Sequence, residues 1–402
     1  MTGLLDMLAR PDEAYPIVHI AGTNGKTSTS RMIAALVAAH GLSTGLFTSP
    51  HLDRVEQRFE LSGRVMTGEE FADAMTLLAP IVDMYEERSG DPITYFELTT
   101  ALAFAWFADR TVDVGVLETG LGGRWDSTNA ATSEVAVVTN IALEHTEILG
   151  DTIGAIAAEK LAILDPGADL VTGGLHPDAL EVAARRAAEQ GGRWFRYGLE
   201  YRPIDPAPTG HGFVFDLSGI HDEYRGLDLR MHGRHQVTNF ATAVAAVEAL
   251  FDRPLDEAAV RETASGVTSP GRMEVLATEP FLVTDGAHNP AGMETLVAAL
   301  AEEFAGVRWT LVFGVMGDKN VIAMLDALAG RVVAAHVAAA DSPRALDAER
   351  AASLVTERLG VPATPHASVA AALTAARATG NHVLVTGSIY VVGEARAALG
   401  VA

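Results

Sequence analysis

The chain has 402 residues, which is too long for one ordinary hydrophobic core and indicates two domains. Its 52 acidic residues outnumber its 29 lysines and arginines, and the formal charge of −23 argues against general nucleic-acid binding, because phosphate contacts need a basic surface. There is no cysteine, which excludes disulfides, thiolate nucleophiles and cysteine-bound metals. The apolar stretches are too short for a membrane span and no secretion signal opens the chain, so we expect a cytoplasmic monomer without membrane or nucleic-acid partners.

The first half of the chain alternates short apolar strands with helical patterns. A buried strand is predicted over residues 15–22 and a helix over residues 27–40, where apolar side chains recur at helical spacing. A capping-box pattern at Thr67 opens a second helix, and a mostly buried helix follows Pro92. Further strands are predicted at residues 43–49, 112–118 and 134–140. Strands alternating with helices are typical of a parallel sheet with crossover helices.

The pattern changes between residues 193 and 230. Residues 194–203 and 212–219 are predicted to form antiparallel hairpin strands, with a loop between them marked by Pro203, Pro206 and Pro208. Two helices then lead to a linker over residues 266–274, after which a second alternating series begins.

The two alternating series of strands and helices therefore predict two α/β domains. Residues 1–267 are expected to form a phosphate-loop ATPase domain with a mostly parallel sheet and a small antiparallel section. Residues 268–402 are expected to form a Rossmann-like α/β domain.

The segment HIAGTNGKTSTS, residues 19–30, has the composition of a phosphate-binding loop followed by a helix. Backbone N–H groups and the positive end of the helix would meet the phosphate there. Lys26 would reach the terminal phosphates, and Thr27 or Ser28 a magnesium ion. The general pattern has a glycine where this chain has Ile20, so a tight turn with an exposed lysine is the alternative.

Two further side chains, Glu118 and His145, are candidates for a metal site at the end of the first sheet. Glu118 ends an apolar strand, where ligands collect in open α/β sheets, and a carboxylate there suits magnesium. His145 follows the next strand and is expected to meet Glu118 across neighbouring strand ends. Taken alone, His145 also fits a loop or capping residue, and Lys160 fits a solvated surface lysine.

Polar residues also end three strands of the second series. They occur in DGAHNP (residues 285–290), MGDKN (316–320) and TGSIY (386–390). Because the carboxyl ends of parallel strands share one edge, these segments predict a second binding surface.

The motifs together resemble one enzyme family. GTNGKTS, TSPHL, ETGLGGRWDSTN, EHT, AAEK, GRHQVTN, PGRME, DGAHNP and VTGSIY occur in the order found in the folate enzymes of the Mur ligase type. The chain resembles folylpolyglutamate synthases and bifunctional dihydrofolate synthases over nearly its whole length. Members of this superfamily have an apolar residue where other phosphate loops have glycine, so Ile20 fits.

The resemblance implies a role for each matching residue. ATP contacts are implied for Thr23, Asn24, Gly25, Lys26, Thr27, Ser28, Asn239, Arg272 and Asp285. Ligands for Mg²⁺, with two ions expected, are implied at Ser49, Glu118, His145 and Lys160, and Lys160 matches a lysine that the family carbamylates. Contacts to the pterin-bearing acceptor are implied for Pro50, His51, Phe96, Glu97, Trp125, Asp126 and Ser127, and contacts to glutamate for His288, Ser388 and Tyr390. Lys26, His145, Lys160 and His288 are the residues expected to take part in catalysis.

The implied reaction is ATP-dependent amide formation between a folate or dihydropteroate carboxylate and L-glutamate. The γ-phosphoryl group of ATP would convert the carboxylate to an acyl phosphate, which the glutamate amine then attacks. A monofunctional folylpolyglutamate synthase and a cell-wall Mur ligase are the alternatives within the superfamily. A nucleotide-triggered binding protein or simple kinase would explain the first loop but not DGAHNP or VTGSIY.

The chain departs from the family pattern at three places. Thr27 replaces a glycine common in the folate members, Gly317 replaces an alanine, and the segment ahead of the first strand is short. Because of the short segment, the sequence predicts activity on dihydropteroate less strongly than activity on folates that already carry glutamate.

Overall fold

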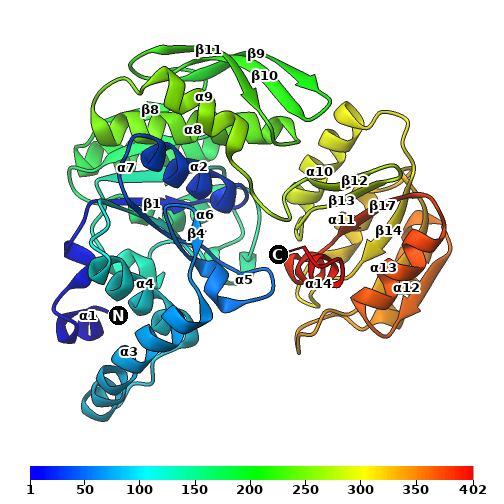
Figure 1. Cartoon of the computed structure of the whole chain (residues 1–402), viewed down its shortest axis with the longest axis horizontal. Helices are drawn as coiled ribbons and strands as arrows, with labels where there is room; N and C mark the ends of the chain where they lie inside the picture. The colour runs from blue at the N-terminus through cyan, green and yellow to red at the C-terminus, as the bar shows by residue number, and fades with distance from the viewer. Residues whose placement is uncertain (402) are drawn as a thin grey trace. The chain divides into compact units, whose positions relative to one another are not determined.

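The computed structural model describes residues 1–401, which form two compact units (Figure 1). The N-terminal unit contains Met1–Ala207, Val214–Arg230 and Gln236–Thr268. The C-terminal unit contains the chain from Ser269 onward, together with the short segments Pro208–Phe213 and Met231–His235. Each unit has its own sheet, and the predicted α/β fold is confirmed.

The N-terminal unit is built on an eight-stranded sheet with the order β4-β3-β2-β5-β1-β6-β7-β8. Strands β2, β5, β1, β6, β7 and β8 run parallel, while β3 and β4 continue one edge antiparallel. The strands are β1 (Ile17–Ala21), β2 (Thr44–Phe47), β3 (Phe59–Leu61), β4 (Arg64–Val65), β5 (Val114–Glu118), β6 (Val135–Val138), β7 (Asp169–Thr172) and β8 (Trp194–Arg196). The central strands β1, β5 and β6 are buried along their whole length, as expected for a parallel sheet covered on both faces.

Helices follow the strands in the alternation that the sequence predicts. They are α1 (Thr2–Met7), α2 (Lys26–Ala39), α3 (Gly68–Ser89), α4 (Tyr95–Asp109), α5 (Thr146–Leu149), α6 (Ile153–Lys160), α7 (Pro177–Gln190), α8 (Arg234–Phe251) and α9 (Glu257–Gly266). Short 3-10 helices occur at η1 (Pro11–Glu13), η2 (Val55–Arg58), η3 (Ser127–Ala130) and η4 (Leu161–Ile163). The capping box predicted at Thr67 is present, and Thr94 and Glu97 form a second one at the start of α4.

A three-stranded antiparallel sheet, β11-β10-β9, accompanies the main sheet. Its strands are β9 (Arg202–Thr209), β10 (Gly212–Ser218) and β11 (Glu223–Leu229). The predicted loop at Pro203, Pro206 and Pro208 is wrong, since all three prolines lie within β9. The predicted hairpin strand over residues 194–203 is also wrong, because residues 194–196 form β8, which pairs parallel with β7.

The C-terminal unit has a six-stranded sheet with the order β12-β13-β17-β14-β15-β16. Only β12 is antiparallel, to β13. The strands are β12 (Glu274–Thr278), β13 (Phe281–Thr284), β14 (Trp309–Phe313), β15 (Val332–Ala338), β16 (Ala363–His366) and β17 (His382–Thr386). The helices are α10 (Pro290–Glu303), α11 (Val321–Ala327), α12 (Ala348–Leu359), α13 (Val369–Ala378) and α14 (Ile389–Ala398).

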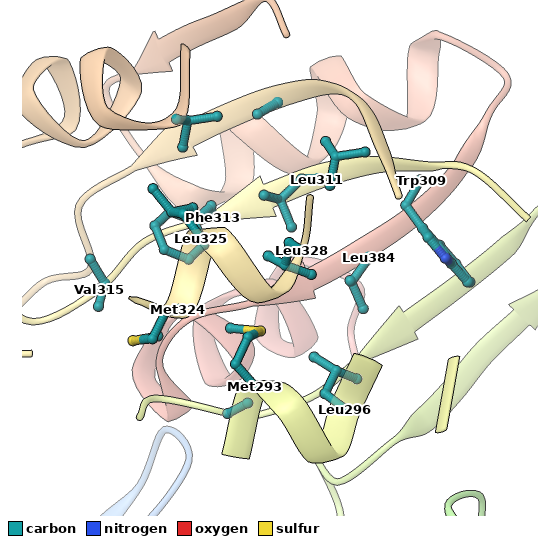
Figure 2. Packing of buried hydrophobic residues seen from close by; sticks show 14 of the residues in the cluster. Met293, Leu296, Trp309, Leu311, Phe313, Val315, Met324, Leu325, Leu328 and Leu384 are labelled. Atoms are coloured by element: carbon teal, nitrogen blue, oxygen red, sulfur yellow. The ribbon is translucent and has the colours of Figure 1, made fainter. Parts of the chain in front are cut away.

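Large apolar side chains fill the space between this sheet and its helices. Figure 2 shows Met293 and Leu296 of α10, Met324 of α11, and Leu311 and Phe313 of β14 as members of one cluster, with Leu296 next to Leu384 of β17. This packing holds β13, β14 and β17 in place, and their carboxyl ends carry the predicted polar segments. Within residues 1–401, no helix combines the length and apolar character needed to cross a membrane.

Candidate active site

The loop between β1 and α2 has the geometry of a phosphate-binding loop. Ile20 is a fully buried strand residue, so the loop begins only after β1. Gly22 must be glycine, because a Cβ there would lie 2.0 Å from the Thr139 Oγ1. Gly25 has a φ of +83° and precedes the first turn of α2, which leaves the helix N–H groups without a side-chain cap. This helix N-terminus can receive an anion.

The loop is held by β6 and closed by its own lysine. The Thr23 N–H donates to the Asn140 backbone oxygen at 2.9 Å, and the Asn24 N–H donates to the Asn140 Oδ1 at 2.9 Å. Lys26 Nζ donates to the backbone oxygens of Gly22 (3.0 Å) and Thr23 (3.2 Å). Asn140 is therefore a site residue that sequence reasoning missed, although it ends a predicted strand and lies four residues before the EHT motif.

Glu118 lies at the end of β5 with 1% of its surface exposed. Its carboxylate accepts a hydrogen bond from the Thr27 hydroxyl at 3.0 Å and from the Ser49 N–H at 3.3 Å. The structure therefore brings the loop, the TSPHL segment and the β5 end together at one carboxylate, with oxygen atoms of the kind that Mg²⁺ prefers.

Lys160, at the end of α6, is buried rather than solvated, with 1% of its surface exposed. Its Nζ donates to the Gly22 oxygen at 2.9 Å and lies 3.6 Å from the Glu144 Oε1. Burial, helped by the charge of Lys26, lowers the pKa of Lys160 to about 8. Glu144 is a second site residue that the sequence reading missed, despite its place beside His145 in the EHT motif.

His145 adopts a left-handed conformation (φ 48°) at the start of α5. The expectation that it follows a strand adjacent to that of Glu118 is wrong, because β1 lies between β5 and β6. Within residues 1–401, no three histidine, aspartate or glutamate side chains form a ready metal-binding group. Any metal in this unit would therefore depend on hydroxyl, lysine-derived or substrate oxygens as well.

The ETGLGGRWDSTN loop is organised by Asp126. Its Oδ2 accepts from the N–H groups of Gly120 (2.8 Å) and Leu121 (2.9 Å), and its Oδ1 accepts from the Thr128 hydroxyl at 2.6 Å. Asp126 thus shapes the loop, and burial raises the pKa of its carboxyl group. Ser127 is the first residue of η3. Trp125 is 89% exposed, so its ring offers an aromatic surface to a ligand.

The other predicted acceptor residues line the same region of the N-terminal unit. The Phe96 ring lies where a Cβ on Gly120 would approach it to 2.7 Å, so the loop and α4 are in close contact. His51 follows the cis Ser49–Pro50 bond and accepts a hydrogen bond on Nδ1 from the Arg58 Nε at 3.0 Å. Burial lowers the pKa of His51, which favours the neutral ring.

Glu97 has a structural role in addition to its predicted one. Its carboxylate caps α4 through Thr94 and lies 3.6 Å from the amino group of Met1.

Asn239 of α8 donates from Nδ2 to the Gln236 Oε1 at 3.0 Å, and its Oδ1 lies 2.7 Å from the position of a Cβ on Gly25. Asn239 therefore borders the phosphate loop.

The C-terminal unit gathers its predicted residues at the ends of β13 and β17. The Asp285 carboxylate accepts from the N–H groups of Met273 and Ala287, both at 2.8 Å, and burial raises its pKa while Arg272 opposes that rise. The Arg272 guanidinium lies against Gly286, where a Cβ would approach its Nη1 to 2.4 Å. A methyl group at position 286 would therefore push the Arg272 side chain aside.

Two helix starts complete this second site. His288 Nδ1 lies 2.9 Å from the Gly286 oxygen, just before α10. Ser388 caps α14 by accepting from the Tyr390 N–H at 3.2 Å, while Tyr390 is partly exposed. The side chains predicted for glutamate binding thus lie at the N-termini of α10 and α14, which favour a carboxylate ligand.

The N-terminal unit has a phosphate loop whose hydroxyl is hydrogen-bonded to a buried carboxylate, and the C-terminal unit is Rossmann-like with polar residues at its strand ends. Together these features define an ATP-dependent ligase of the Mur type. Residues 20–247 match the Mur ligase middle domain, and residues 271–389 match the Mur ligase glutamate ligase domain.

Comparison with known relatives identifies the family to which the chain belongs within the Mur ligases. The dihydrofolate synthase/folylpolyglutamate synthase of Mycobacterium tuberculosis is 38% identical over 377 residues, which cover 90% of this chain and 77% of the relative. The folylpolyglutamate synthase of Lacticaseibacillus casei is 33% identical over 348 residues, covering 85% and 81% of the two chains. A crystal structure of the M. tuberculosis folylpolyglutamate synthase complexed with ADP and AMPPCP superposes with a TM-score of 0.95, at 36% identity, over 99% of this chain and 94% of that one. The chain belongs to the dihydrofolate synthase/folylpolyglutamate synthase family, and it is an ATP-dependent ligase.

Proposed function

We propose that this chain joins L-glutamate to the carboxylate of a reduced folate, of dihydropteroate, or of both, at the expense of ATP. The observation that carries the proposal is the buried Glu118 carboxylate bonded to the Thr27 hydroxyl at the start of α2. The complexes of the M. tuberculosis relative with ADP and AMPPCP support ATP as the co-substrate. A cytoplasmic location is part of the proposal, because ATP is a substrate of the reaction, and the enzyme is proposed to act as a monomer.

ATP phosphates would bind at the N–H groups of residues 25–28, because the N–H groups of Thr23 and Asn24 already donate to Asn140. Lys26 now donates to loop oxygens at 3.0 and 3.2 Å, and it would exchange those bonds for the terminal phosphates. Asn239, Arg272 and Asp285 are proposed as further nucleotide contacts.

The oxygen donors at Glu118 fit Mg²⁺, a hard cation that is usually bound by one or two carboxylates together with substrate phosphates. Thr27, Ser49, Glu118 and His145 would hold it, with Lys160 as a further ligand if carbamylated, and two ions are proposed. When bound, Mg²⁺ supplies positive charge that stabilises the transferring phosphoryl group. The protein's part is to keep the Glu118 carboxylate aligned through the Thr27 and Ser49 hydrogen bonds.

Lys160 is suited to carbamylation, because only a neutral amine attacks carbon dioxide. The amine nitrogen would bond to the carbon atom of CO₂ and lose a proton, leaving a carbamate anion. The lowered pKa of Lys160, about 8, increases the neutral fraction near physiological pH. The carbamate would replace a buried cation by an oxygen ligand.

The acceptor carboxylate would then take the γ-phosphoryl group from ATP, and the acyl phosphate would be attacked by the glutamate amine with release of phosphate. Pro50, His51, Phe96, Glu97, Trp125, Asp126 and Ser127 are proposed to position the acceptor. His288, Ser388 and Tyr390 are proposed to bind glutamate through the helix starts that they occupy.

The experiment that tests the function is product analysis by mass spectrometry. The protein is incubated with ATP, Mg²⁺ and glutamate, and with dihydropteroate or tetrahydrofolate as acceptor. Amide product from either acceptor supports the proposal, and product from tetrahydrofolate alone identifies a monofunctional folylpolyglutamate synthase. Phosphate release that needs neither acceptor nor glutamate would rule the proposal out.

A further inference from the structure

A basic pocket lies on the N-terminal unit beside the ETGLGGRWDSTN loop. It has a volume of about 220 Å³ and is lined by Arg124, Ala158, Leu161, Ala162, Val182, Arg185, Arg186 and Glu189. Residues 182, 185, 186 and 189 recur at helical spacing, so they form one face of α7. Three of the lining residues are arginines, in a chain whose formal charge is −23.

The three arginines differ in how much of their bonding capacity is used. Arg124 bonds to the Glu159 carboxylate at 2.8 Å and to the Ala158 oxygen at 3.2 Å. Arg186 donates from Nη2 to the Leu164 oxygen at 2.8 Å, and its Nη1 lies 4.0 Å from the Glu189 carboxylate. The Arg186 Nε is buried and has no hydrogen-bond partner within the part of the chain that the structure describes.

Arg185 is exposed and makes no hydrogen bond or ion pair to any residue between 1 and 401. Since buried donors are nearly always satisfied, the unpartnered Arg186 Nε points to a ligand with acceptor oxygens, and the exposed Arg185 guanidinium beside it can bind the same ligand.

We propose that this pocket binds the α-carboxylates of the γ-glutamyl tail of a folate that has already been extended. This inference rests on the proposed function and names the part of the substrate that the proposed function leaves unassigned. Arg124 lines the pocket and directly precedes Trp125 on the loop at which the acceptor is proposed to bind. Each added glutamate leaves one more carboxylate behind the reacting end, and each increases repulsion from the acidic protein. A local arginine cluster offsets that repulsion.

The test compares tetrahydrofolate carrying one glutamate with tetrahydrofolate carrying three, in the wild type, Arg185→Ala and Arg185→Lys. Arg377→Ala is the control, because Arg377 is an exposed arginine at the end of α13, outside the pocket. In Arg185→Ala the ratio of the triglutamate KM to the monoglutamate KM is expected to rise about three- to tenfold, the cost of one hydrogen bond at an exposed position. Arg185→Lys should recover part of the ratio, and Arg377→Ala should leave it unchanged.

Calorimetric binding of the same two folates without ATP separates this inference from the proposed function. If no folate yields an amide product but the triglutamate still binds more weakly to Arg185→Ala, only the proposed function fails. Normal turnover with an unchanged KM ratio in Arg185→Ala would overturn the inference. Failure of the wild-type protein to bind the triglutamate would overturn it as well.

Discussion

Thr27 is the residue at which the loop departs from the folate pattern, and its hydroxyl donates to the buried Glu118 at 3.0 Å. Thr27→Val keeps the shape of the side chain but removes the donor, so it should lower kcat about 10- to 100-fold, whereas Thr27→Ser should retain most activity. Steady-state kinetics with tetrahydrofolate, ATP and glutamate checks this prediction. Equal activity of the valine and serine variants would show that the hydroxyl is dispensable.

Lys160 should make stability depend on pH in a particular window. Its pKa is about 8 in the folded chain and near 10.5 when unfolded, so below pH 8 burial of the charged amine costs about 3 kcal/mol. Between pH 8 and 10.5 the unfolded chain binds more protons, and the wild type should regain that free energy relative to Lys160→Met. Denaturant unfolding of both proteins in CO₂-free buffer at pH 7.5 and pH 10 measures the difference. A difference that stays constant with pH would contradict the buried, charged lysine.

Much of the site could be predicted from single residues, and the misses have a common cause. Gly25, Lys26 and Glu118 have distinctive chemistry and fixed positions relative to predicted strands. Asn140 and Glu144 contribute through a backbone oxygen, an amide and an ion pair that only the folded loop creates. The local sequence pattern does not reveal such partners, because these contacts form only when three separate segments of the chain come together in the fold.

At the scale of elements, the junction of β13 with α10 depends on one glycine. A Cβ at Gly286 would lie 2.4 Å from the Arg272 Nη1 and 2.7 Å from the Ile389 Cδ1. Gly286→Ala should therefore displace Arg272 and raise the KM for ATP several-fold. Because the contacts are ends of flexible side chains, the unfolding free energy should fall by only about 1 kcal/mol. Gly266→Ala is the matched control, since a Cβ there meets nothing within 4 Å. ATP-dependent kinetics and urea unfolding check both changes, and identical behaviour of the two variants would contradict the packing argument.

The strands that precede functional loops were predictable because they are short, apolar and followed by polar turns. The antiparallel section was harder to predict. Pro203, Pro206 and Pro208 indicate a loop in most contexts, but β9 is an edge strand, where missing N–H donors need no partner. β8 was misassigned for a related reason, since a three-residue edge strand has too few residues to show whether it pairs parallel or antiparallel.

At the scale of the whole molecule, the order of the motifs along the chain made it possible to predict both the family and the two-unit fold. No single motif would have been enough, since the first loop alone also fits a simple kinase. Matches to two Mur ligase domains over residues 20–247 and 271–389 confirm that reading.

The formal charge of −23 predicts how stability responds to salt. Net charge far from zero destabilises a compact state by self-repulsion, and salt shortens the range of that repulsion from about 30 Å at 0.01 M to about 10 Å at 0.1 M. Raising NaCl from 10 to 300 mM without substrates should therefore increase the melting temperature by roughly 2–6 °C, equivalent to about 1–2 kcal/mol. Scanning calorimetry in NaCl and in choline chloride distinguishes screening from specific cation binding, because both salts screen equally. A melting temperature that falls in both salts would mean that local ion pairs, such as Arg193 with Asp169 and Asp252, outweigh the net repulsion.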